Sequence, residues 1–265
     1  MRLRLTVAYV GTRYSGWQIQ EKPDAPPTVQ GLLEAAFSQV LCRPVRVHGA
    51  GRTDAGVHAD GQVAHVDIPD ERAGLDWVRV CNSRLPDDVC LLDAVPAPPG
   101  FHARFSACGK IYTYQIWQDR RILPPRLAPF VWSCGYRLDW EAVRRALPHF
   151  LGEHDFASLQ NAGTDVTDTT RELRRLELRP DLALLPGHPD AMAVQVEGSG
   201  FLKQMVRNLV GLLVSVGRGR TAPEDVPALL AARDRRCLSQ IATAPAHGLT
   251  MTRVLYQESC CQVSQ

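Results

Sequence analysis

The sequence lacks several features that would assign it to a particular class of protein. Its eight cysteines include no C-x-x-C pair, which argues against a zinc cage or a dithiol redox site. Its longest apolar run, residues 209–216, is interrupted by Gly211 and Ser215 and is far too short to cross a bilayer. The apolar stretch within the first ten residues is also too short for a secretory signal. We therefore expect a cytoplasmic protein.

Lysine is scarce as well. Of the 30 basic residues, only Lys22, Lys110 and Lys203 are lysines, and all the others are arginines. Arginine is the better phosphate ligand because its planar group donates two parallel hydrogen bonds, but codon usage in a GC-rich genome explains the bias equally well. The net charge of +2 and the 45% hydrophobic content are those of an ordinary globular chain, so charge alone does not indicate a nucleic-acid partner.

The first part of the chain has a recognisable order of elements. Period-two alternation predicts a strand over residues 2–10, and Thr28 precedes a helix with apolar residues at three-and-four spacing through Leu41. Two strands are then predicted over 45–50 and 62–68, a helix from Asp76 to about Leu85, and a strand over 89–95. The order β-α-β-β-α-β is the ferredoxin-like arrangement.

A proline-rich stretch, residues 95–100, separates this part from a second one with a similar order. Strands are predicted over 110–117, 172–179, 191–197 and 251–256, and helices over 139–151, over 201–216 and after Pro223. The sequence thus predicts an α+β fold with two ferredoxin-like halves, residues 1–105 and 106–265. We expect them to form a continuous, mostly antiparallel sheet, with helices on one face and a cleft between the halves for a large ligand.

The most unusual segment is the glycine-rich loop Gly49–His58, with Asp54 near its centre. Three glycines in eight residues allow a tight, exposed turn. An aspartate in such a turn often has only a conformational role, as in an Asx-turn of a β-hairpin. A phosphate-binding loop is a third interpretation, but the spacing fits neither G-x-x-x-x-G-K-[ST] nor G-x-G-x-x-G.

The loop and its extension to His65 resemble the signature of the TruA family of tRNA pseudouridine synthases. Further segments resemble that family in order along the chain: residues 9–20, 28–34, 102–107 with 110–114, 152–156, 200–208 and 244–249. The resemblance therefore extends over nearly the whole sequence.

The resemblance implies the isomerisation of uridine to pseudouridine in tRNA, at positions 38, 39 and 40 of the anticodon stem-loop. The C1′–N1 glycosidic bond breaks, the uracil turns while it is held, and a C1′–C5 bond forms. Nothing is oxidised and nothing is hydrolysed overall, so we expect neither a cofactor nor a metal. The resemblance also implies a homodimer.

By the same resemblance the catalytic residues are Asp54, Tyr112 and Arg207. A carboxylate can act as a nucleophile or stabilise an ion beside the sugar, and whether Asp54 attacks C1′, adds to the base or supports proton loss from C2′ stays open. A nearby cation keeps a carboxylate ionised in a closed pocket, and Arg207 is expected to supply it. Lys203, on the same side of the predicted helix, is a lower-ranked alternative.

Tyr112 is expected to stack on the flipped uracil, whereas Tyr114, on the same strand face, is expected in the core. Arg52 and His58 flank Asp54 and are expected to bind the substrate, as a wedge or through phosphates, although His58 could equally cap the turn. Three alternative functions are the same chemistry at another uridine position or on another RNA, a non-catalytic RNA-binding protein, and a base hydrolase that releases uracil.

Overall fold

The computed structural model describes residues 1–20, 26–119, 123–161, 163 and 166–257, and it divides the chain into two compact units. The first unit comprises Met1–Lys110 and the residues from Thr250 on, and the second comprises Ile111–Leu249. The final strand therefore belongs to the first unit, whereas the predicted division at residue 105 placed it in the second half. No helix among the described residues is both long and apolar enough to cross a membrane.

The strands of the first unit form a mixed sheet in the order β4-β1-β3-β10, and β2 also pairs with β3. Their bounds are β1 Arg2–Tyr9, β2 Val47–Gly49, β3 His58–Asp67, β4 Val89–Pro96 and β10 Leu249–Tyr256. The pairs of β1 with β3 and β4 and of β2 with β3 are antiparallel, and β10 runs parallel to β3. In chain order, the elements before β5 follow β-α-β-β-α-β.

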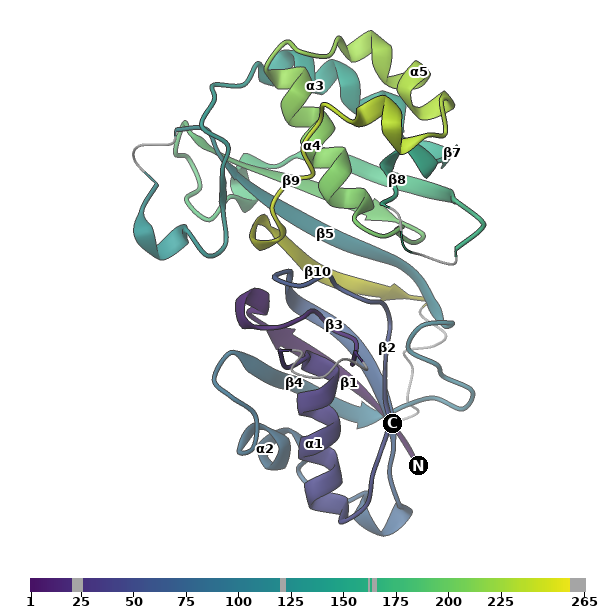
Figure 1. Ribbon diagram of the computed structural model, residues 1–265. Coiled ribbons are helices and arrows are strands. Elements are labelled where there is room, and N and C mark those ends of the chain that lie inside the picture. The colour runs from purple at the N-terminus through teal and green to yellow at the C-terminus, as the bar shows by residue number, and fades with distance from the viewer. Residues whose placement is uncertain (21–25, 120–122, 162, 164–165, 258–265) are drawn as a thin grey trace. The chain divides into compact units, whose positions relative to one another are not determined.

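Two helices, α1 (Val29–Leu41) and α2 (Trp77–Asn82), lie beside this sheet (Figure 1). They contact each other, α1 contacts β2, and α2 contacts β4. Both begin where the sequence predicts: the side chain of Thr28 accepts a hydrogen bond from Gly31 N–H, and that of Asp76 accepts one from Arg79 N–H. The alternate burial along β1 leaves one of its faces fully covered, so the core lies on one side of the strand.

The second unit has the strand order β5-β9-β8-β7, and β6 pairs in parallel with β5. Its strands are β5 Ala107–Trp117, β6 Trp132–Ser133, β7 Gly152–Asp155, β8 Thr170–Leu178 and β9 Ala191–Gly198. Its helices are α3 Trp140–Ala146, α4 Met205–Gly217 and α5 Val226–Ala231. The short strands β6 and β7 have no counterpart in the sequence prediction, although the α+β class is confirmed.

Helix α4 differs in one informative way from the predicted helix over 201–216. It begins at Met205, because Gln204 has the left-handed backbone conformation, with φ at 60°, and ends the preceding loop. Every residue of α4 except Arg207 is buried. Helix α4 is therefore a core helix, with one half-exposed position in its first turn.

Candidate active site

The Asp54 loop joins β2 to β3 in the first unit and ends in a tight turn. The carbonyl of Asp54 accepts a hydrogen bond from Val57 N–H at 3.1 Å, which closes the turn Asp54–Val57. Gly56, at the third position, has φ at 80°, as a type II turn requires. The side chain of Asp54 is half-buried, so the turn holds a carboxylate at the protein surface and partly out of water.

The end of β1 and the segment that follows it are hydrogen-bonded to this loop. Tyr9 Oη and Thr53 Oγ1 share a hydrogen bond of 2.8 Å, and Trp17 N–H donates to the Thr53 carbonyl at 3.2 Å. Gly56 N–H donates to the Tyr14 carbonyl at 3.4 Å. Burial raises the pKa of Tyr9 above its ordinary value, so its hydroxyl stays protonated. The backbone on both sides of Asp54 is thus fixed by contacts distant in sequence.

Two glycines of that segment allow the close approach. A Cβ at Gly16 would lie 2.3 Å from the Thr53 carbonyl oxygen, and the φ of Gly16 is 83°. A Cβ at Gly11 would lie 2.0 Å from the Val57 carbonyl oxygen. Real Cβ atoms do not approach that closely, so any larger residue must displace the loop. The sequence prediction assigned no role to these two positions, because their importance comes from a tertiary contact.

Arg52 and His58, which flank Asp54 in the sequence, differ in their exposure to solvent. Arg52 is exposed beside the turn, where it can reach a large ligand. His58 is only 3% exposed, and its Nδ1 accepts a hydrogen bond of 3.0 Å from Gly11 N–H. This placement agrees with the structural alternative for His58, which is that it fastens the turn.

Tyr112 lies on β5 in the second unit and is 7% exposed. Its ring packs edge-to-face on Phe201, with the ring centroids 5.1 Å apart and an interplanar angle of 85°. Tyr114 is fully buried, as predicted, and its hydroxyl donates to the Pro245 carbonyl at 2.8 Å. Burial raises the pKa of Tyr114 well above its ordinary value. Both tyrosines are thus buried, Tyr114 completely and Tyr112 slightly less, and the stacking role of Tyr112 stays a prediction.

Arg207 occupies the one half-exposed position of α4, a helix that is otherwise buried. Its Nε donates to the Ala244 carbonyl at 2.8 Å, and Ala244 N–H donates to the Arg207 carbonyl at 3.2 Å. The first bond holds the guanidinium, and the second ties the backbone of Ala244 to the helix. Burial, and to a smaller degree the charge of Arg207, lowers the pKa of His247.

Lys203 precedes α4, so the expectation that it shares a helix face with Arg207 is wrong. Its exposed Nζ donates to the Gly163 carbonyl at 3.2 Å. It lines a cavity of about 510 Å³ together with Arg235 and Ser239, among other residues. Asp54 belongs to the first unit, while Tyr112 and Arg207 belong to the second, so the predicted ion pair of Asp54 with Arg207 stays a prediction.

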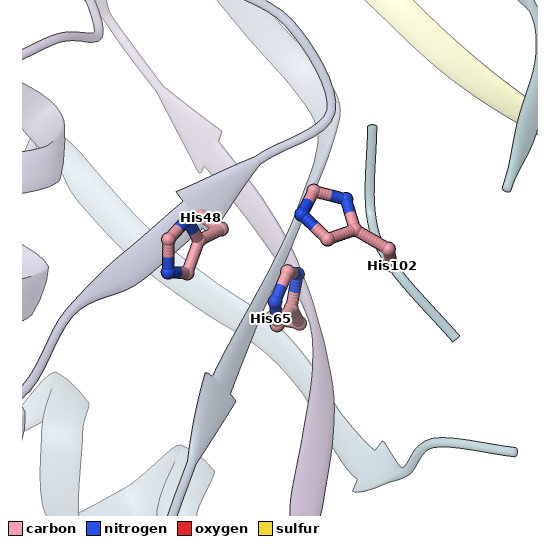
Figure 2. A group of neighbouring side chains, drawn as sticks. All are labelled: His48, His65 and His102. Carbon is pink, nitrogen blue, oxygen red and sulfur yellow. The ribbon is translucent and has the colours of Figure 1, made fainter. Parts of the chain in front are cut away.

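Among the described residues, His48, His65 and His102 form one group that could be considered for a metal, since their ligand atoms lie within 4.8 Å of one another (Figure 2). The rings of His48 and His65 are stacked, however, with their centroids 4.9 Å apart. His65 Nδ1 accepts from Ala103 N–H at 3.2 Å, and His102 Nδ1 accepts from Arg104 N–H at 3.1 Å. Each of these neutral rings then carries its proton on Nε2, so neither has a nitrogen lone pair left for a metal.

Comparison with known proteins identifies close relatives. The family model for tRNA pseudouridine synthase matches residues 5–106 and 146–257. A tRNA pseudouridine synthase A of Nitratidesulfovibrio vulgaris is 53% identical over 96% of this chain and 99% of its own length. Relatives of the same name are 51% identical in Oleidesulfovibrio alaskensis, over 98% of both chains, and 40% identical in Geobacillus kaustophilus, over 98% of this chain and 96% of the relative.

Similarity to solved structures is weaker. A crystal structure of a Cbf5-Nop10-Gar1 complex aligns with 80% of this chain and 45% of that chain, at 12% sequence identity and a TM-score of 0.37. The similarity is too low to carry an argument about the site.

Proposed function

Since this chain belongs to the tRNA pseudouridine synthase family, and is therefore an isomerase, we propose that it acts at positions 38, 39 and 40 of the tRNA anticodon stem-loop, with Asp54 as the nucleophile. The bond that Asp54 forms to the nucleoside is transient and breaks again before the product leaves. Overall, the C1′–N1 bond of the uridine breaks, a C1′–C5 bond replaces it, and the proton on C5 moves to a nitrogen of the product. Atoms and electrons balance within the substrate, so the reaction needs no oxidant, reductant or group donor.

The observation that carries this proposal is the way Asp54 is held. Its carboxylate is half-buried on a turn held on one side by the bonds of Thr53, from its side chain to Tyr9 and from its carbonyl to Trp17, and on the other by the bond of Gly56 N–H to the Tyr14 carbonyl. A nucleophile that must meet C1′ needs this kind of fixed position, since misplacement by about 1 Å can cost roughly 100-fold in rate. An Asx-turn needs no such external support.

Arg207 would keep the Asp54 carboxylate ionised when the substrate excludes water. Desolvation raises the pKa of a carboxyl, and a protonated carboxyl cannot act as a nucleophile, whereas a nearby guanidinium lowers that pKa. The link of Arg207 to Ala244 supports this role, because it orients the guanidinium before the substrate arrives.

Tyr112 would stack on the flipped uracil. A base that leaves the RNA stack loses stacking energy, and an aromatic ring restores part of it. The packing of Tyr112 on Phe201 supports this role, because a ring already fixed by its neighbour loses little further freedom on binding.

Arg52 would occupy the space that the flipped base leaves, or bind the phosphate beside it. Unstacking costs on the order of a few kcal/mol, and a cation next to the turn can offset part of that cost. The exposure of Arg52 next to Asp54 supports this role. His58 supports the turn instead, through its bond to Gly11.

The proposal is tested with purified protein and an unmodified tRNA transcript, without added metal or nucleotide and with EDTA present. Carbodiimide labelling followed by reverse transcription should map pseudouridine to positions 38, 39 and 40, and the variant Asp54→Asn should produce none. Stops only at other positions would refute the site preference, and release of free uracil would indicate a hydrolase. Loss of activity in EDTA would refute the absence of a metal requirement.

We also propose that the protein is a cytoplasmic homodimer. Transfer RNA is present in the cytoplasm, and a tRNA is comparable in mass to one chain of 29.3 kDa, so a second chain would supply further binding surface. Light scattering of the free protein should give a mass of two chains, and a mass of one chain would refute this part of the proposal.

A further inference from the structure

One phenylalanine projects into solvent from the loop between β4 and β5. Phe105 is 77% exposed, while no other large apolar side chain in the described part of the chain is more than 51% exposed. A whole phenyl ring in water forgoes the stabilisation that burial would give it. Such a ring on a surface that binds a ligand is more often an anchor for that ligand than an accident of folding.

The backbone beneath this ring is fixed. His102 N–H donates to Ser106 Oγ at 3.0 Å, and Ser106 N–H returns a bond of 2.9 Å to the His102 carbonyl. Ala103 N–H donates to His65 Nδ1, and the Ala103 carbonyl accepts from Tyr256 Oη at 2.7 Å. A ring on a rigid loop loses little conformational entropy when something packs against it.

The ring is largely exposed although two side chains lie against it. Its centroid lies 4.3 Å from that of His102, with the two planes 33° apart, so one face packs on the imidazole. The guanidinium of Arg104 lies over the ring, 5.8 Å from its centroid, and the Arg104 side chain is exposed, so a ligand that displaces it meets both the ring and a cation. Within the described residues, no carboxylate forms a salt bridge with Arg104. The loop thus presents an aromatic face beside a cation.

We propose that Phe105 stacks on an unpaired base of the bound tRNA and that Arg104 binds a phosphate next to that base. A flat ring with an adjacent arginine is the arrangement by which proteins hold single-stranded nucleic acid, because every base offers a π face and every nucleotide a phosphate. The inference rests on the proposed function only in taking tRNA as the substrate, and it adds a second aromatic contact, on the first unit.

The affinity test uses the Asp54→Asn background, so that bound tRNA is not converted. Phe105→Ala should weaken tRNA binding roughly 5- to 100-fold, whereas Phe105→Trp should keep most of the affinity. Phe105→Leu should resemble Phe105→Ala, because leucine retains apolar area but has no π face. The matched control is Leu92→Ala on β4, which removes a 51% exposed apolar side chain from the same unit and should leave the affinity unchanged.

A fully paired RNA duplex serves as the second probe. It offers no unpaired base, so Phe105→Ala should bind it as the parent protein does. Salt dependence separates the two residues: Arg104→Gln should lower the slope of log Kd against log salt by about one, and Phe105→Ala should leave the slope unchanged. Because Phe105 is so exposed, all its variants should melt at the parent temperature.

Equal affinity of Phe105→Ala and the parent for tRNA would overturn the proposal. The proposal would also be overturned if Phe105→Ala lost equal affinity for tRNA and for the duplex. A change of Phe105→Ala from dimer to monomer in light scattering would overturn it too, because the ring would then belong to a protein interface. These results differ from failure of the proposed function, in which the wild-type chain makes no pseudouridine in any tRNA. If the wild-type protein makes pseudouridine but Phe105→Ala binds tRNA as tightly as the parent protein, only this inference is refuted.

Discussion

Substitution of Gly16 by alanine should disable the enzyme without touching a catalytic residue. The new Cβ would lie 2.3 Å from the Thr53 carbonyl oxygen and 3.0 Å from the Asp54 carbonyl carbon. Since real Cβ atoms essentially never come closer than 3.0 Å to another heavy atom, the loop must retreat by at least about 0.7 Å. The φ of 83° adds a strain of roughly 1–2 kcal/mol for any residue with a side chain.

A shift of this size moves the Asp54 carboxylate with the turn, because the Trp17 bond to Thr53 joins the two segments. We expect kcat/KM for pseudouridine formation to fall on the order of 100-fold, while the melting temperature falls by several degrees. Pseudouridine formation in an unmodified tRNA transcript measures the first quantity and a thermal melt the second.

The chain offers matched glycines that separate the causes. Gly11→Ala introduces a contact of 2.0 Å with the Val57 carbonyl oxygen, Gly100→Ala introduces only a positive φ of 77°, and Gly74→Ala introduces neither. Pseudouridine formation should fall in Gly11→Ala and Gly16→Ala and stay near wild type in Gly74→Ala. Gly100→Ala should lower the melting temperature more than the rate. A Gly16→Ala enzyme with wild-type kcat/KM would show that the loop position does not control the chemistry.

Three further predictions concern other contacts. Burial lowers the pKa of His65 from 6.5 to about 4, so below pH 6.5 the unfolded chain binds a proton at this residue that the folded chain does not. The contribution of His65 to the unfolding free energy should therefore fall as the pH is lowered from 6.5 to 4. In His65→Asn, whose side-chain oxygen can still accept from Ala103 N–H, urea titrations should show a smaller fall. Arg207→Met should reduce turnover on the order of 100-fold with tRNA affinity nearly unchanged, whereas Lys203→Ala should keep most of the turnover in the same kinetic assay. Tyr114→Phe should cost about 1 kcal/mol in denaturant unfolding because its bond to Pro245 is lost, with kcat retained.

Elements specified by local sequence were predictable. Helix α1 begins at Val29 because Thr28 supplies the cap, and β1 follows directly from its alternating pattern. The start of α4 was not predictable in this way. Phe201 and Leu202 continue the apolar spacing of the helix, but the left-handed backbone at Gln204 prevents the helix from starting before Met205. The two-residue strand β6 exists only by pairing with β5, which no local pattern reveals.

In the candidate site, too, the features set by local sequence could be predicted and those set by tertiary contacts could not. The residue types around Asp54 indicated a turn and a carboxylate, whereas Tyr112 and Arg207 became candidates only through the resemblance to the family. The burial of His58 and the supports at Gly11 and Gly16 depend on segments far apart in sequence meeting in space, so a single sequence gives no periodic signal for them. A glycine-rich stretch preceding such a loop is the one clue that could have been used, since a close backbone approach is a common reason for glycine.

The most direct test of the central claim is the single-turnover conversion of a tRNA transcript by Asp54→Asn, with enzyme in excess and tRNA binding checked in parallel. Our account expects the transcript to be bound with near wild-type affinity and no pseudouridine to accumulate, because asparagine fills the same space without a nucleophilic charge. Pseudouridine appearing at a rate near that of wild type would contradict it.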